Sequence, residues 1–306
     1  MNASLLFSGL GVATASYITL RFLRFIRLYT RPSSVKRYIY GENPWALVTG
    51  ASDGIGLAIA QELATNGFNV ILHGRNPEKL ETTKTRLEGE HKNVQFKSVV
   101  LNASSATSQQ IEQAVASLDG LNLTVLVNNV GGAAKVQPLE KNTADELDSV
   151  MNVNARFPAQ LTKALLPKLA RPQGPTLIMN IGSMADLGVP YATVYGASKA
   201  FNMSMSSCLA VEVKAEGRNI EVVGISVGRV TDVGHNKEDS SFFTPTARTM
   251  ARACVDRVGC GRYIVVGYIG HAIQKFVVDL SPWIVFEMLV VPTMKDRKEN
   301  EERKQV

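Results

Sequence analysis

Short apolar runs alternate with amphipathic stretches between Trp45 and about Val230. The apolar runs read WALVTG, NVILHG, VQFKSVVL, LTVLVNNV, PTLIMNIGS and EVVGISV. Each is continuous and rich in Val, Ile or Leu, as expected for a parallel strand that is buried on both faces. The stretches between them, such as GLAIAQELATNGF, are typical of helices. This alternation predicts an α/β fold, a single Rossmann-type domain built on a doubly wound parallel sheet.

An apolar segment near the start of the chain is followed by basic residues. Leu5 to Leu20 carries no charge, and as a helix it would be about 24 Å long, against a bilayer core of roughly 30 Å. The basic residues that follow are Arg21, Arg24, Arg27, Arg31, Lys36 and Arg37. A cleaved signal peptide would carry its positive charge before the apolar run. We therefore expect residues 1–40 to form a hydrophobic membrane anchor, either spanning the membrane or lying in its interface, with the rest of the chain facing the cytosol.

The pattern becomes less regular after Val230. A polar loop and a helix-like stretch precede an apolar region over residues 262–292, which charged residues and a proline interrupt. It contains no uninterrupted apolar span of about 18 residues, so a second transmembrane helix is not predicted. We divide the chain into the anchor with its basic flank (1–40), a central domain (41–270), and an apolar extension with a charged tail (271–306) that faces a membrane or a substrate.

The charge and the cysteines exclude some kinds of function. The net charge is +6, but the clearest cluster of positive charge follows the apolar N-terminal segment, which favours lipid headgroups over nucleic acid. Cys208, Cys254 and Cys260 lack the spacing of zinc ligands. We therefore expect reduced, structural thiols and no metal site.

The sequence TGASDGIG, residues 49–56, lies between the first expected strand and the first expected helix. Glycines at this place let the backbone turn tightly and approach a pyrophosphate, which the N–H groups and dipole at the start of the helix then bind. The spacing is G-x-x-x-G-x-G rather than G-x-G-x-x-G, and a simple strand–helix turn is the alternative. We expect this loop to bind a dinucleotide through Thr49, Gly50, Ser52, Asp53, Gly54, Ile55 and Gly56.

The end of the second expected strand distinguishes between the two nicotinamide cofactors. An acidic residue there would bind the ribose 2′-hydroxyl of NAD. This chain instead has Gly74 followed by Arg75, whose guanidinium suits a 2′-phosphate. We therefore predict NADP(H) as the cofactor. Asn102, after the third strand, is expected near the adenine.

Tyr195 and Lys199 are candidate catalytic residues. They stand four apart, so a helix places them on one face, and an ammonium near the phenol favours the phenolate. Tyr195 could then act as a general acid toward a ketone. The hydroxyl of Ser183, at the end of the fifth strand, could bond the same carbonyl oxygen. Asn128, at the end of the fourth strand, leaves room for the nicotinamide ribose.

These motifs resemble the short-chain dehydrogenase/reductase family in order and approximate spacing. The resemblance covers T-G-x-x-x-G-x-G, N-N-x-G, Ser183 and Tyr-x-x-x-Lys, from about residue 45 to residue 231. It implies that the central domain is an NADP(H)-binding reductase domain and that Tyr195 and Lys199 also bind the cofactor, with Lys199 at the nicotinamide ribose. It further implies that Asn154, with Asn152 as the competing candidate, positions a water that relays protons to Lys199, and that Val230 lies at the cofactor. Val227 stands where the family often has proline, so we expect an altered loop over the nicotinamide.

Within the family, the chain resembles the membrane-bound very-long-chain 3-oxoacyl-CoA reductases and the microsomal 17-beta-hydroxysteroid dehydrogenases. The N-terminal apolar segment, TVLVNNVG and VGCGRYIVVGYIGHAIQKFV carry this resemblance, and the terminal RKQV resembles a retrieval signal. It implies NADPH-dependent reduction of a hydrophobic ketone, foremost a 3-oxoacyl-CoA of fatty-acid elongation, at the endoplasmic reticulum membrane. A homodimer and elongation proteins are the implied partners. A steroid dehydrogenase, a ketoreductase of specialised metabolism and a catalytically silent NADPH-binding regulator remain alternatives, although the intact Ser183, Tyr195 and Lys199 favour an enzyme.

Overall fold

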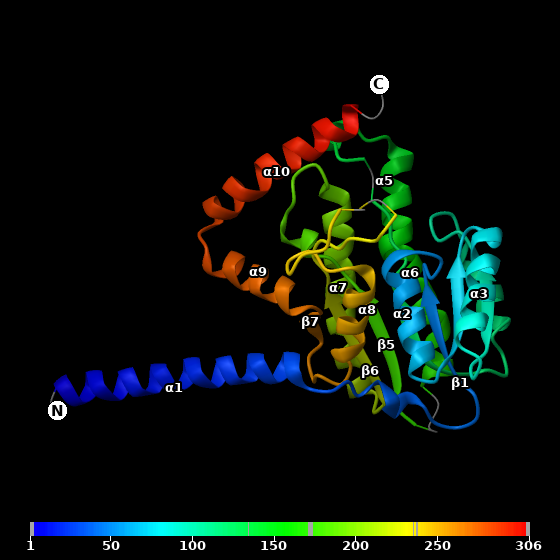
Figure 1. The fold of residues 1–306 in the computed structure, drawn as a ribbon, viewed down its shortest axis with the longest axis horizontal. Coiled ribbons are helices and arrows are strands. Elements are labelled where there is room, and N and C mark those ends of the chain that lie inside the picture. Colours follow the sequence, from blue (N-terminus) through cyan, green and yellow to red (C-terminus); the bar gives the residue numbers. More distant parts are fainter. Residues whose placement is uncertain (1–2, 134, 171–173, 235, 237, 304–306) are drawn as a thin grey trace.

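A seven-stranded parallel sheet with the order β3-β2-β1-β4-β5-β6-β7 forms the centre of the protein (Figure 1). The structure, a computed structural model, describes residues 3–133, 135–170, 174–234, 236 and 238–303. The strands are β1 (Pro44–Thr49), β2 (Asn69–Gly74), β3 (Phe96–Val100), β4 (Asn122–Asn128), β5 (Thr176–Ile181), β6 (Ile220–Ser226) and β7 (Ile264–Val266). The doubly wound sheet and its first six strands are as predicted. The short edge strand β7 was not predicted.

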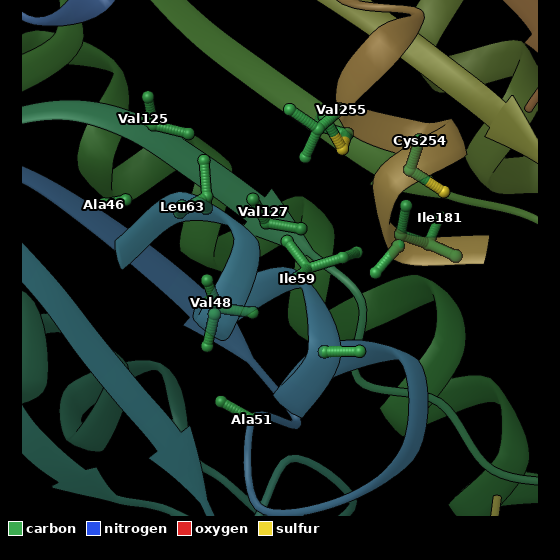
Figure 2. Packing of buried hydrophobic residues seen from close by; sticks show 14 of the residues in the cluster. Ala46, Val48, Ala51, Ile59, Leu63, Val125, Val127, Ile181, Cys254 and Val255 are labelled. Atoms are coloured by element: carbon green, nitrogen blue, oxygen red, sulfur yellow. The ribbon is translucent and has the colours of Figure 1, made fainter. Parts of the chain in front are cut away.

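Helices cover both faces of this sheet. One face carries α2 (Gly54–Thr65), α3 (Pro77–Glu90) and α8 (Ala247–Asp256), and the other carries α4 (Ser108–Ala116), α6 (Phe157–Leu169) and α7 (Thr193–Ala215). Side chains alternate along β1, so Val48 packs beneath α2 while Leu47 packs on the opposite face. Figure 2 shows Ile59 and Leu63 of α2 gathered with Val48 and Val127 in the first of these cores.

The remaining internal elements are short and lie mostly near the carboxyl ends of the strands. The helix α5 (Ala144–Met151) begins with a capping box at Thr143 and continues through a π-helical turn, η3 (Asn152–Arg156), into α6. The 3-10 turn η4 (Met184–Leu187) follows β5. Two further 3-10 turns are η1 (Val35–Tyr38) and η2 (Leu139–Lys141).

The N-terminal helix α1 (Ala3–Thr30) extends away from the sheet and joins the domain at its C-terminal end (Figure 1). There the Tyr29 hydroxyl donates to the carbonyl of Val266 at 2.8 Å, and the Arg257 guanidinium donates to the carbonyl of Leu28. The sequence led us to expect a membrane anchor in this segment. Among the helices within the described ranges, none has both the length and the apolar character needed to cross a membrane.

Two C-terminal helices form an arm beyond the sheet. The helix α9 (Ile269–Leu280) runs outward, and α10 (Trp283–Arg303) returns toward the loop that follows β4 (Figure 1). At that end Glu301 accepts a hydrogen bond from the backbone N–H of Val136 at 3.0 Å. We call the turn between α9 and α10 the apolar corner, because large hydrophobic side chains are exposed there: Phe276, Val277, Leu280, Trp283, Ile284, Met288 and Leu289. The first helix of this arm begins at Ile269, and a division of the chain at residue 271 stays a prediction.

Candidate active site

The glycine-rich loop lies where the sheet changes winding direction, between β1 and β4. Ligands of doubly wound folds bind at this point. The loop feeds directly into α2, whose first turn presents backbone N–H groups and the positive end of the helix dipole. Gly54 has a φ of +54°, and a Cβ on Gly56 would stand 2.2 Å from the carbonyl oxygen of Gly50. Side chains at these two positions would strain or fill the loop, so the local geometry fits a cradle for a pyrophosphate.

Buried polar groups hold the loop from beneath. The Thr49 hydroxyl donates to Val127 and accepts from the N–H groups of Asn129 and Val130, at 2.9 to 3.1 Å. The amide of Asn129 donates to the carbonyl of Thr49 at 2.9 Å. His73 accepts from the N–H of Gly50 at 3.4 Å through Nδ1, and burial lowers the pKa of its imidazole to about 4. The loop therefore rests on a neutral histidine and an amide from the neighbouring strands.

Arg75 and Lys79 form the basic edge of the cofactor half. Arg75 directly follows β2 and is exposed, as is required for a 2′-phosphate ligand. Lys79, in the first turn of α3, pairs with Asp53 of the glycine loop at 2.7 Å. Our sequence analysis named Arg75 and did not name Lys79, which follows it by four residues. Asn102 is exposed after β3 and caps its own turn by accepting from Ser104.

Asn128 lies deeper than its neighbour in the NNVG motif. Its amide donates to Thr162 at 2.9 Å and to Asn180 at 2.8 Å, and its side chain is buried between β4, β5 and α6. Asn129, which the sequence analysis did not single out, is the residue whose side chain contacts the glycine loop. A role for Asn128 at the cofactor stays a prediction.

Ser183, Tyr195 and Lys199 lie close to the carboxyl end of β5. Ser183 caps η4, where its Oγ accepts from the N–H of Ala185 at 3.1 Å. Tyr195 and Lys199 occupy successive turns of α7, and the Lys199 Nζ is 5.8 Å from the centre of the tyrosine ring. Lys199 is only 4% exposed and donates to the carbonyl of Ile181 at 3.2 Å. The buried Lys199 side chain thus lies beside the half-buried phenol of Tyr195.

Asn154, rather than Asn152, faces this group of residues. It is fully buried in η3, and its amide bonds both the N–H and the carbonyl of Gly132, at 3.1 and 2.6 Å. A Cβ on Gly131 would stand 2.9 Å from Asn154 Oδ1 and 3.0 Å from Lys199 Nζ, so both polar groups flank the same glycine. Asn152 is only half-buried. This arrangement supports the choice of Asn154 for the relay.

A buried histidine supports the loop that follows β6. His271 of α9 is buried, accepts from the N–H of Gly228 at 3.1 Å and bonds the carbonyl of Arg229 at 3.0 Å. Burial lowers the pKa of His271. Val230 is buried, and its carbonyl accepts from Asn236 at 2.9 Å. A histidine from the C-terminal arm therefore braces the loop in which Val227 replaces the usual proline.

A dinucleotide cradle at the switch point after β1, together with a Ser–Tyr–Lys group at the end of β5 two strands away in the same sheet, is typical of a nicotinamide-dependent oxidoreductase of the Rossmann class. The family model described as short chain dehydrogenase matches residues 44–241. The chain belongs to the short-chain dehydrogenase family, as its motifs predicted.

Comparisons with individual proteins agree with this assignment. The chain is 32% identical over 288 residues to the very-long-chain 3-oxoacyl-CoA reductase of Kluyveromyces lactis, covering 89% of this chain and 82% of that protein. It is also 32% identical to the protein of that name from Schizosaccharomyces pombe, covering 88% and 83%. A metagenomic short-chain oxidoreductase solved in complex with NADP superposes with a TM-score of 0.60 at 25% identity, covering 73% of this chain and 96% of that one.

Proposed function

We propose that this protein reduces the keto group of a long-chain 3-oxoacyl-CoA with NADPH. The intact catalytic group supports reduction of a ketone, and the names of the relatives support the acyl substrate. The observation that carries the proposal is a largely apolar pocket lined by Gly196, Ala197 and Ala200 of α7, the helix that also carries Tyr195 and Lys199. A catalytically silent regulator is the weaker alternative, because such a protein would not need Ser183, Tyr195 and Lys199 together.

The described residues can perform the proton chemistry of this reduction. Bound NADPH supplies a hydride to the carbonyl carbon. Tyr195 donates its proton to the carbonyl oxygen, and the Ser183 hydroxyl donates a hydrogen bond to the same oxygen as negative charge develops. The buried Lys199 ammonium stabilises the phenolate that remains and returns a proton to it. The fit of the cofactor rests on the glycine cradle and, at the 2′-phosphate, on Arg75 and Lys79.

The pocket has a volume of about 410 Å³ and lies between α7, the loop after η4, and α10. Ala197 and Ala200 of α7 form one wall, and Phe286, Val290 and Val291 of α10 form another. Asp186 and Glu287 also line it; burial raises the pKa of Asp186, and the Lys275 ammonium opposes that rise. An apolar chain would gain about 0.8 kcal/mol for each CH₂ buried here, whereas the two acids disfavour the phosphates of CoA.

The position of the apolar corner supports attachment to a membrane surface. Trp283 belongs both to this exposed corner and to the lining of the pocket. Helix α1 exposes Phe7, Leu10 and Ile18 and extends on the same side of the sheet as the corner (Figure 1). Amphipathic segments followed by arginines bind lipid interfaces. We therefore place the protein at the cytosolic face of the endoplasmic reticulum, where elongation proteins are its expected partners. Lys304 of the terminal RKQV, which resembles a retrieval signal, lies outside the described residues.

The test is a chain-length profile of the purified, detergent-solubilised protein. NADPH oxidation is measured with 3-oxoacyl-CoAs of increasing length and with 17-ketosteroids. Phenylalanine at Ala200 would fill the pocket, so A200F should lower kcat/KM for the longest chains by about tenfold or more and leave the shortest nearly unchanged. S204F, one turn further along α7 and outside the pocket, is the matched control.

Two outcomes would contradict this proposal. Reduction of ketosteroids but of no acyl-CoA would replace the substrate class. An equal loss of kcat/KM for short and long chains in A200F, or the same loss in S204F, would show that the acyl chain does not bind in this pocket.

A further inference from the structure

A buried polar chain joins the sheet to the catalytic helix beneath the proposed active site. Asn128 donates to Asn180 at 2.8 Å, and Asn180 donates to the Ser206 hydroxyl at 2.8 Å. Ser206 donates to the carbonyl of Asn202 at 2.6 Å, and the Asn202 amide donates to the main-chain carbonyl of Asn154 at 2.6 Å. All five residues are at most 5% exposed. The chain therefore ends on the residue expected to relay protons.

The sequence removes one donor that the Asn154 carbonyl would otherwise have within its own helix. In an α-helix the carbonyl of residue 154 would accept from the N–H of residue 158. Residue 158 is proline, which has no N–H, and the backbone here forms the π-helical turn η3. π-helical turns of this kind occur frequently at functional sites. The amide of Asn202 supplies the donor that Pro158 lacks.

The same contact fixes which way the Asn202 amide points. A carbonyl only accepts, so the nitrogen of Asn202 must face Asn154 and the oxygen must face away. That oxygen is buried and has no hydrogen-bond partner among the described residues. Lys199 lies three residues earlier on the same helix face, and its ammonium has three donors, of which one reaches Ile181.

We propose that Asn202 is a positioning residue for proton relay in this reductase. Its amide N–H holds the carbonyl of Asn154 and the π-helical turn, so that the Asn154 side chain stays beside Lys199. Its amide oxygen, which is buried and has no hydrogen-bond partner among the described residues, faces away from that carbonyl. In each turnover Tyr195 gives one proton to the substrate oxygen, Lys199 returns one to Tyr195, and solvent restores the proton of Lys199. The inference rests on the proposed ketone reduction.

Three variants of the full-length protein test this role. N202L removes the amide at similar volume and should lower kcat about tenfold, with the KM for NADPH unchanged. N202D is nearly isosteric, and its neutral carboxyl can donate where the carboxylate cannot. Its kcat should therefore recover toward that of the wild type as the pH is lowered. T176A removes a buried hydrogen bond outside this polar chain, from the Thr176 hydroxyl to the carbonyl of Leu169, and should lower the melting temperature while leaving kcat and its pH profile unchanged.

Amide hydrogen exchange over residues 152–157 gives a readout that does not depend on turnover. N202L should accelerate exchange in this segment, and T176A should not. Wild-type kcat and pH profile in N202L, with only a melting temperature like that of T176A, would overturn the inference. If the wild type reduces no ketone, the proposed function fails, and exchange alone decides: unchanged rates in N202L then refute the positioning role.

Discussion

The two halves of the site are built in different ways. The cofactor half is a backbone cradle, held from beneath by Thr49, His73 and Asn129 through buried hydrogen bonds. The substrate half is an open pocket between α7 and α10, and the arm that closes it exposes large hydrophobic side chains. The difference indicates that the glycine loop is held by several contacts from neighbouring strands. Under the proposed function, the substrate range depends instead on the C-terminal arm, which lines the pocket through Phe286, Val290 and Val291.

Removing the phenol at the junction of the two halves should have the largest effect. Y195F keeps the ring and its packing but removes the proton donor. We expect kcat to fall by about 10³-fold, because general acid catalysis contributes roughly 10²- to 10⁴-fold. NADPH binding, followed by cofactor fluorescence, should change little. Y263F, at an exposed tyrosine next to β7, is the control and should retain full activity.

Activity of Y195F within a few-fold of the wild type would mean that another group donates the proton. Tyr195 would then not be the catalytic residue that connects the cofactor half with the substrate half. Loss of both kcat and NADPH affinity would instead place Tyr195 chiefly in the cofactor half.

Because His73 is buried under the glycine loop, the free energy of unfolding should decrease at acidic pH. The pKa of this imidazole is about 4 in the folded protein and about 6.5 when unfolded. Between these values the unfolded chain binds a proton that the folded protein does not, so stability falls as the pH drops from about 6.5 to about 4. The shift corresponds to about 3 kcal/mol of unfolding free energy, and no further loss arises from this group below pH 4.

Urea denaturation of the wild type and of H73Q at several pH values measures this contribution. The difference in unfolding free energy between the two proteins should shrink as the pH falls through this window. H91Q, at a half-buried surface histidine, should keep the pH dependence of the wild type. A constant difference between wild type and H73Q from pH 7 to pH 4 would contradict the role of a buried neutral imidazole under the loop.

The sheet and the candidate catalytic residues could be predicted from the sequence more completely than the residues that hold them in place. Strands such as NVILHG and motifs such as Tyr195 with Lys199 follow local rules of burial and helical spacing, so they were predictable. Strand β7 has only three residues within a longer apolar run, and its pairing with β6 depends on tertiary structure. His271 lies more than forty residues from the loop it braces. The contact of Asn202 with Asn154 likewise joins two helices, although Pro158 marked the missing donor in the sequence.

The smallest expected effect concerns Arg75, whose role should differ from that of the rest of the cofactor half. R75A removes an exposed guanidinium after β2 and leaves the glycine cradle intact. We expect the dissociation constant of NADPH to rise about tenfold and that of NADH to stay unchanged, because only NADPH carries the 2′-phosphate. R86A, further along α3 and paired with Glu90, should change neither. Equal weakening of NADPH and NADH binding by R75A would show that this arginine supports the fold of the cradle and does not bind the 2′-phosphate. Lys79 would then be the residue to test for selectivity between the two cofactors.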